Sequence, residues 1–262
     1  MRDLFASDRA LVGVVHLQAL PGTPHNTLSP EEIVERALAE AEILTEAGFD
    51  AIILENMHDR PYLNKEVGPE IVATMARACA EVRKITSLPL GLQILAAANE
   101  AAVAVAHATG VDFVRAEGFV FGHMADEGLI EATAGPLLRF RKKIGATRVK
   151  ILCDIKKKHC SHSITADVSL AETAKAAEFF CADGLVVTGV ATGEKTDPED
   201  LNEALQATGL PIWIGSGVTL ENIADYGKAH GLIVGSWIKE EGDWRRPIDP
   251  ERCVRLAAAF KE

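Results

Sequence analysis

Short apolar runs alternate with longer amphipathic stretches along the whole chain. We interpret the apolar runs as eight buried strands, which cover residues 11–17, 51–54, 90–95, 113–116, 149–153, 184–188, 212–214 and 232–234. Continuous runs that are rich in Val, Ile and Leu are typical of parallel strands, whose two faces are both covered.

Between the apolar runs, hydrophobic residues recur with the spacing of amphipathic helices. The predicted helices cover residues 30–47, 67–86, 100–108, 129–144, 170–181, 198–208, 220–226 and 250–260. Ser29, Asp197 and Asp249 each precede a proline, which is the arrangement of a helix N-cap followed by Pro at the first helical position. Gly48 and Gly110 are expected to end their helices shortly before the next strand.

This strand–helix repeat, with a period of roughly 30 residues, predicts a parallel sheet with crossover helices. Eight units fit a closed (β/α)8 barrel, which takes about 250 residues, and the chain has 262. The alternative is an open doubly wound sheet, but the first strand is not followed by its fingerprint, G-x-G-x-x-G. We see no linker or low-complexity segment, so we predict one (β/α)8 barrel domain over residues 1–262.

Composition and charge exclude several classes of partner. The 27 basic and 38 acidic residues give a net charge of −11, which disfavours nucleic acid because its phosphates are repelled. We expect no membrane insertion, since no stretch is long and apolar enough. Five cysteines without a C-x-x-C pair are typical of a reduced cytosolic protein. We therefore expect a cytoplasmic protein that, like many barrels, forms a homo-oligomer.

The glycine-rich segments after strands seven and eight give the strongest indication of function. Gly215, Ser216 and Gly217 follow the seventh run, and Gly235 and Ser236 follow the eighth. Glycines let backbone amides approach an anion, and the loops after these two strands form the usual phosphate site of a barrel. A phosphorylated small molecule is the predicted partner. The alternative is that the glycines only make tight turns.

Polar residues that follow the other strands are candidates for catalysis, because the active site of a barrel forms at the carboxyl ends of its strands. Asp154 and Lys156 are two residues apart, so in an extended chain both side chains point to the same side. There Asp154 could act as a general base, and Lys156 could share acid–base work or form a Schiff base. The alternative is an ion pair at the rim, with residues 156–158 simply solvated.

Glu55 directly follows an apolar run, where an unpaired carboxylate is costly. Arg115 is its candidate partner, and a structural bridge between the two explains them as well as a catalytic role does. His16 is a further catalytic candidate. Other residues at strand ends could contact the substrate; they are Asn56, Gln93, Thr188 and Gly189. Residues 189–197 are a candidate loop that closes over the site.

A metal site has weaker support in the sequence. Asp154, His159 and His162 could together hold a divalent ion, but a single Cys/His cluster without a second one is a weak indication. A solvated loop is the alternative. The sequence requires no cofactor, and a divalent metal stays an option.

Several segments, in order along the chain, resemble the BtpA family. They are HLQALPGTP from His16, AGFDAIILENMHDRPY from Ala47, VGPE from Val67, DFVRAE from Asp112 and DIKKKH from Asp154. The resemblance implies a phosphate-binding (β/α)8 barrel of the ribulose-phosphate-binding type. Family motif positions then include Glu55, Asn56, Arg115, Asp154 and His159. The resemblance carries no catalytic assignment, although the family takes its name from a member linked to photosystem I biogenesis.

Three functions are compatible with these observations. The first is an enzyme that isomerises, epimerises or cleaves a phosphorylated sugar or related small phosphate ester, with Asp154 as general base. The second is a metal-dependent hydrolase or lyase of nucleotides or nucleoside phosphates. The third is a non-enzymatic assembly or biogenesis factor built on a barrel. Polar residues crowd the predicted strand ends, which favours an enzyme, although the fold alone decides nothing.

Overall fold

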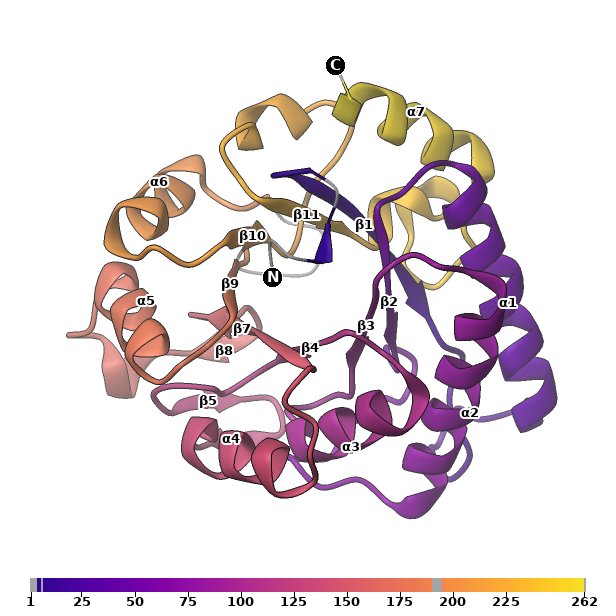
Figure 1. Ribbon diagram of the computed structural model, residues 1–262, viewed down its shortest axis with the longest axis horizontal. Helices are drawn as coiled ribbons and strands as arrows, with labels where there is room; N and C mark the ends of the chain where they lie inside the picture. The colour runs from indigo at the N-terminus through magenta and orange to yellow at the C-terminus, as the bar shows by residue number, and fades with distance from the viewer. Residues whose placement is uncertain (1–3, 6, 190–194, 262) are drawn as a thin grey trace.

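Eight parallel strands close into a barrel with helices around its outside (Figure 1). The strands are β1 (Ala10–His16), β2 (Ala51–Glu55), β3 (Leu90–Gln93), β4 (Phe113–Ala116), β7 (Lys150–Ile155), β9 (Gly184–Val187), β10 (Ile212–Ile214) and β11 (Gly231–Val234). Pairing of β1 with both β2 and β11 closes the barrel. This computed structural model describes residues 4–5, 7–189 and 195–261. The predicted (β/α)8 barrel is confirmed, and the open-sheet alternative is wrong.

Helices follow most of the strands and cover the outside of the barrel. They are α1 (Pro30–Glu46), α2 (Pro69–Ile85), α3 (Asn99–Thr109), α4 (Ala134–Lys143), α5 (Leu170–Phe179), α6 (Pro198–Ala207) and α7 (Pro250–Lys261). The predicted caps are present: Ser29 forms a capping box with Glu32 at α1, and the Asp197 side chain accepts from a backbone N–H at α6. No helix in the described ranges is long and apolar enough to cross a bilayer.

Two predicted helices differ from the structure. Residues 129–144 do not form one helix, because Leu129 and Ile130 belong to β6 (Gly128–Ile130), and α4 begins at Ala134. This strand pairs with β5 (His123–Ala125), which also pairs with β8 (Cys160–Ser161), in a small antiparallel sheet. The chain turns at Gly128, whose φ of 102° favours glycine. The helix predicted at 220–226 is a single 3₁₀ turn over Ile223–Tyr226.

The interior of the barrel has a lower and an upper layer of side chains. The lower layer is apolar and includes Val12, Val14, Ile53, Phe113, Leu152, Val186, Trp213 and Ile233. Two residues further along the same strands, side chains of the same orientation are polar; this upper layer includes His16, Glu55, Gln93, Arg115, Asp154 and Thr188, all buried. His16 lies beside Glu55, and Glu55 beside Gln93, in the strand register. A polar floor therefore forms at the carboxyl ends of the strands.

Candidate active site

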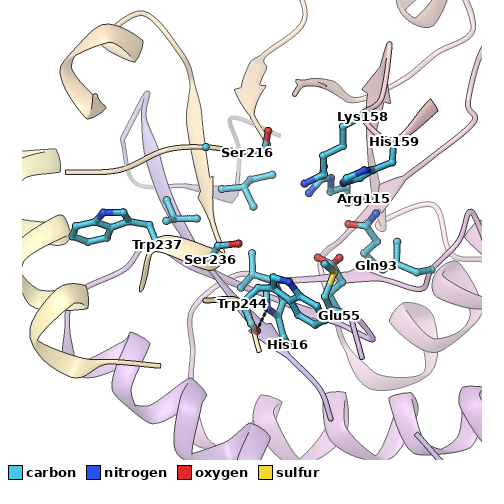
Figure 2. A pocket seen from close by; sticks show the side chains of 18 of the residues that line it. His16, Glu55, Gln93, Arg115, Lys158, His159, Ser216, Ser236, Trp237 and Trp244 are labelled. Carbon is cyan, nitrogen blue, oxygen red and sulfur yellow. Dashed lines mark hydrogen bonds between the residues drawn. The ribbon is translucent and has the colours of Figure 1, made fainter. Parts of the chain in front are cut away.

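A cavity of about 660 Å³ lies over this polar floor. Figure 2 shows its two sides: Ser216, Ser236 and Trp237 come from the segments after β10 and β11. On the other side are Arg115 from β4, Gln93 from β3 and Lys158 from the segment after β7. A volume of this size accommodates a small ligand such as a sugar phosphate with a further group attached.

The segments after β10 and β11 form a cradle of backbone N–H groups, which we call the anion cradle and define as residues 215–219 and 235–237. All eight of its residues line the cavity. Within the described chain, the N–H groups of Gly217, Val218 and Ser236 have no protein acceptor. Gly217 has a φ of 67°, and the side-chain amide of Asn222 donates to its carbonyl oxygen. The glycine-rich segments thus present donors to the cavity as well as making turns.

A cation beside the anion cradle comes from α7. The guanidinium of Arg252 lies 4.4 Å from the ring centre of Trp237, and its Nε donates to the Trp237 carbonyl oxygen at 2.6 Å. Arg252 also lines the cavity. No motif marks Arg252 in the sequence, because it is one of many charged residues in an amphipathic helix. A positive charge next to free amides is the electrostatic setting that an anion requires.

Ser216, Thr188 and Gly189 hold the neighbouring loops in place. The Ser216 hydroxyl accepts from the Gly189 N–H at 2.8 Å, and the Thr188 hydroxyl accepts from the Lys158 N–H at 3.2 Å. Ser216 lines the main cavity, whereas Thr188 and Gly189 line a smaller pocket behind it. The structure thus gives Thr188 and Gly189 supporting contacts. Most of the predicted closing loop, residues 190–194, lies outside the described residues.

At the carboxyl ends of β4 and β7, Arg115 and Asp154 form a buried ion pair. Arg115 Nε donates to one carboxylate oxygen of Asp154 at 2.8 Å, and Nη2 donates to the other at 3.0 Å. Gly215 leaves room for this guanidinium, because a Cβ there would lie 3.0 Å from Arg115 Nη2. Arg115 thus pairs with Asp154, and the structural bridge to Glu55, which was one of two interpretations of the sequence, is not formed. Arg115 lines the main cavity, and Asp154 lies behind it.

Glu55 remains as a carboxylate on the cavity wall. Its residue is only 8% exposed, and no hydrogen bond connects its side chain to a described residue. Burial raises the pKa of the Glu55 carboxyl, and the charges of Arg115 and Lys158 oppose that rise. A carboxyl in this setting holds its proton at higher pH than an exposed one, as proton-transferring carboxyls in enzymes do.

The three consecutive lysines after β7 have different partners. Lys156 leaves the strand with a φ of 49°, and its ammonium donates to the carbonyl oxygens of Thr165 and Val168. The prediction that Lys156 and Asp154 lie together over the cavity is wrong, because β7 ends at Ile155 and the alternation ends with it. Lys157 forms an ion pair with Glu117 at 3.0 Å. Lys158, which the alternative of a solvated rim included, lines the cavity.

His16 closes the floor of the cavity on the side of β1. Its Nδ1 lies 3.2 Å from the carbonyl oxygen of Trp244, so Nδ1 carries the proton and Nε2 is the acceptor. Burial, followed by the charge of Lys239, lowers the pKa of the imidazole well below its usual value, which keeps it neutral. A Cβ at Gly235 would lie 3.0 Å from Nε2, so the anion cradle and His16 are in close approach.

Gln93 and Asn56 differ in what they offer a ligand. Gln93 lines the cavity, and its Oε1 is buried without a hydrogen-bond partner in the described chain. Asn56 does not line the cavity: its carbonyl oxygen accepts from the Leu95 N–H at 2.7 Å, and its amide donates to Asp59 at 2.8 Å. Gln93 is thus available to a ligand, whereas Asn56 joins β2 to the loop after β3.

The candidate metal ligands Asp154, His159 and His162 do not converge on one site. His159 lines the main cavity, and Asp154 is held by Arg115. His162 Nε2 lies 2.9 Å from the carbonyl oxygen of Lys157, beside the ring of His123. Over the ranges that the structure describes, no three His, Cys, Asp or Glu side chains form a group able to hold a metal ion.

The fold and this cavity define a (β/α)8 barrel whose candidate active site lies at the carboxyl ends of the strands. Residues 7–262 match the BtpA family, and the chain belongs to that family. It is 47% identical to an uncharacterised Caenorhabditis elegans protein labelled mitochondrial, over 97% of this chain and 94% of that one. It is 34% identical to the photosystem I biogenesis protein BtpA of Synechocystis sp., over 98% and 90%.

Solved structures with the same fold have far lower identity. A phosphoribosyl anthranilate isomerase from Thermus thermophilus matches with a TM-score of 0.61 at 12% identity, over 96% of this chain and 98% of that one. An orotidine 5'-monophosphate decarboxylase from Methanocaldococcus jannaschii matches with a TM-score of 0.57 at 15% identity, over 97% and 99%. At these identities the likeness is one of fold.

Proposed function

We propose that this protein is an enzyme that transfers protons on a phosphorylated sugar or a related small phosphate ester, in an isomerase, epimerase or lyase reaction. One observation carries the proposal: one cavity is lined both by an anion cradle and by a buried carboxyl that has no hydrogen-bond partner among the described residues. Binding of a remote phosphate can hold a reacting carbon in place. The names of two barrels of like fold, a phosphoribosyl anthranilate isomerase and an orotidine 5'-monophosphate decarboxylase, agree with a phosphorylated substrate.

In this proposal Glu55 carries the proton that we first expected Asp154 to carry. Both oxygens of Asp154 accept from Arg115, and Asp154 lies outside the main cavity. Its role is to position Arg115, whose guanidinium faces the cavity and can stabilise negative charge on a substrate oxygen. Glu55 has no such partner and a raised pKa, so it can give and take a proton. Neutral His16 offers Nε2 as a hydrogen-bond acceptor.

The phosphate anchor can be tested by thermal unfolding in the presence of inorganic phosphate, glycerol phosphate and a panel of phosphorylated pentoses. A ligand at a hundred times its Kd adds about 2.7 kcal/mol to the free energy of unfolding, a midpoint rise of about 5–10 °C for a chain of this size. Ser236→Asp places a carboxylate in the anion cradle and should abolish the rise. Ser87→Asp is the matched control, on an exposed serine that precedes β3 at the other end of the barrel.

The outcomes separate clearly. A rise with a phosphorylated sugar in the wild type and in Ser87→Asp, but not in Ser236→Asp, supports the anchor. If no phosphorylated compound shifts the midpoint, or if Ser236→Asp responds like the wild type, the anion cradle is not a phosphate site and the proposal fails.

A further inference from the structure

Lys158 differs from the other lysines near the cavity in the contacts of its ammonium. Among the described residues, no hydrogen bond or ion pair is recorded for its Nζ. Lys157, which also lines the cavity, is paired with Glu117, and Lys156 donates to two carbonyl oxygens behind it. Farther away, Lys239 is fully buried and paired with Glu40 at 2.7 Å. An amine without a partner that faces a substrate-sized cavity is available for chemistry.

The surroundings of Lys158 favour its neutral form. Figure 2 shows the side chain reaching from the segment after β7 into the side of the cavity that Arg115 occupies. Burial lowers the pKa of the amine, and the neighbouring charge of Arg115 lowers it further, against the opposing charge of Glu55. A desolvated lysine beside a second cation is the setting in which enzymes use an amine as a nucleophile. The bond from its backbone N–H to Thr188 fixes where the side chain starts.

We propose that Lys158 forms an imine with the carbonyl carbon of a phosphorylated ketone or aldehyde bound by the anion cradle. This assignment rests on the proposed function and names both the class of substrate and the residue that carries the covalent step. The cavity places the two partners on opposite sides, with the anion cradle on one and Lys158 on the other (Figure 2). A ligand that spans the cavity therefore presents its phosphate to one side and its carbonyl to the other.

Lys158 and Glu55 together can supply every proton transfer that formation of the imine requires. The lone pair of the neutral amine attacks the carbonyl carbon, and the carbonyl oxygen takes up the proton that the nitrogen loses, which gives a neutral carbinolamine. Glu55, protonated, gives its proton to the hydroxyl, which leaves as water and leaves a protonated C=N bond. The Glu55 carboxylate then takes a proton from the neighbouring carbon, and that electron pair forms an enamine. Return of a proton and addition of water release the amine without any change of oxidation state.

Pyridoxal phosphate and pyridoxal are a matched pair of probes for this inference. Both carry the same aldehyde, and only the first carries a phosphate. We would incubate the full-length protein with each probe, reduce any imine with borohydride and locate the adducts by peptide mass mapping. The expected result is one dominant adduct at Lys158 with pyridoxal phosphate, about tenfold slower labelling by pyridoxal because it lacks the anchoring phosphate, and competition by inorganic phosphate.

Two variants sharpen the assignment. Lys158→Arg keeps a long basic side chain but cannot form the imine, so it should lose the adduct while retaining any phosphate-induced rise in the unfolding midpoint. Lys84→Met removes a lysine whose side chain is 66% exposed and should leave the adduct unchanged. Because the peptide map of the wild type already names the modified residue, the result does not depend on either variant folding well.

Failure of this inference is distinct from failure of the proposed function. If pyridoxal phosphate raises the midpoint but labels exposed lysines as much as Lys158, or labels Lys158→Arg fully, the imine is overturned and the phosphate anchor stands. If both probes label Lys158 equally and inorganic phosphate does not compete, the reactive lysine stands and the phosphate anchor is overturned.

Discussion

The two layers inside the barrel come from the same strands and the same orientation of side chains, yet they are opposite in chemistry. In the lower layer, the Trp213 ring packs against Phe113 at 6.0 Å and Phe5 at 5.3 Å. In the upper layer, Arg115 pairs with Asp154, and the Glu55 side chain has no hydrogen-bond or ion-pair partner in the part of the chain that the structure describes. The two layers are two residues apart, about 7 Å along a strand. The lower layer stabilises the fold, whereas the upper layer costs stability and contains the candidate catalytic residues.

The largest expected effect comes from the lower layer. Trp213→Ala removes a side chain that is 1% exposed, and such truncations cost about 3–5 kcal/mol through lost burial and the cavity left behind. Urea unfolding should show this loss. The folded variant should still show the phosphate-induced rise in its thermal unfolding midpoint, because the upper layer is intact. A folded variant that no longer binds phosphate would contradict the separation of the two layers.

The next effect tests the ion pair of the upper layer. Arg115→Met leaves the Asp154 carboxylate buried without its partner, which costs toward the lower end of about 3–5 kcal/mol. The double variant Arg115→Met/Asp154→Leu should regain most of that stability, since an apolar pair of similar size replaces the ions. Neither variant should turn over the substrate. A double variant with full activity would show that the pair only stabilises the fold.

The smallest expected effect is a pH-dependent change in stability when Glu55 is replaced. Burial raises the pKa of this carboxyl in the folded state, so the folded protein favours its protonated form. Stability from that proton is fully present below the ordinary carboxyl pKa and is lost as the pH rises through the folded-state pKa. Glu55→Gln should therefore be more stable than the wild type at neutral pH, and the difference should shrink in acid. Equal stability at every pH would mean that the carboxyl is not perturbed.

The positions of the strands and of the polar floor were predictable because both follow from local pattern. Period-two alternation continues to the last residue of each strand, so His16, Glu55, Gln93 and Arg115 could be assigned to one layer. The same rule failed at Lys156, one residue beyond the end of β7, where the backbone turns to a positive φ. Lys158 was not identified because no repeating pattern fixes the direction of a side chain in a loop.

Contacts between distant segments were the other part that the sequence did not reveal. Arg252 reaches the anion cradle from α7 by packing on Trp237, and Arg60 packs on the Trp244 ring at 4.8 Å. Leu129 and Ile130 were assigned to a helix because two apolar residues next to a helical pattern resemble its first turn. Their pairing with β5 depends on the turn at Gly128.

Closure of the barrel between β1 and β11 has a kinetic consequence. The contact of His16 with the Trp244 carbonyl joins residues 228 positions apart, and the β1–β11 pairing spans a similar length of chain. Native pairings between such distant segments are slow to form. During synthesis, one edge of β1 therefore stays unpaired until β11 has been made. Unpaired apolar edges promote association with other chains. His16 and Gly235 meet only when that last edge is covered, so the cavity is complete only after this folding step.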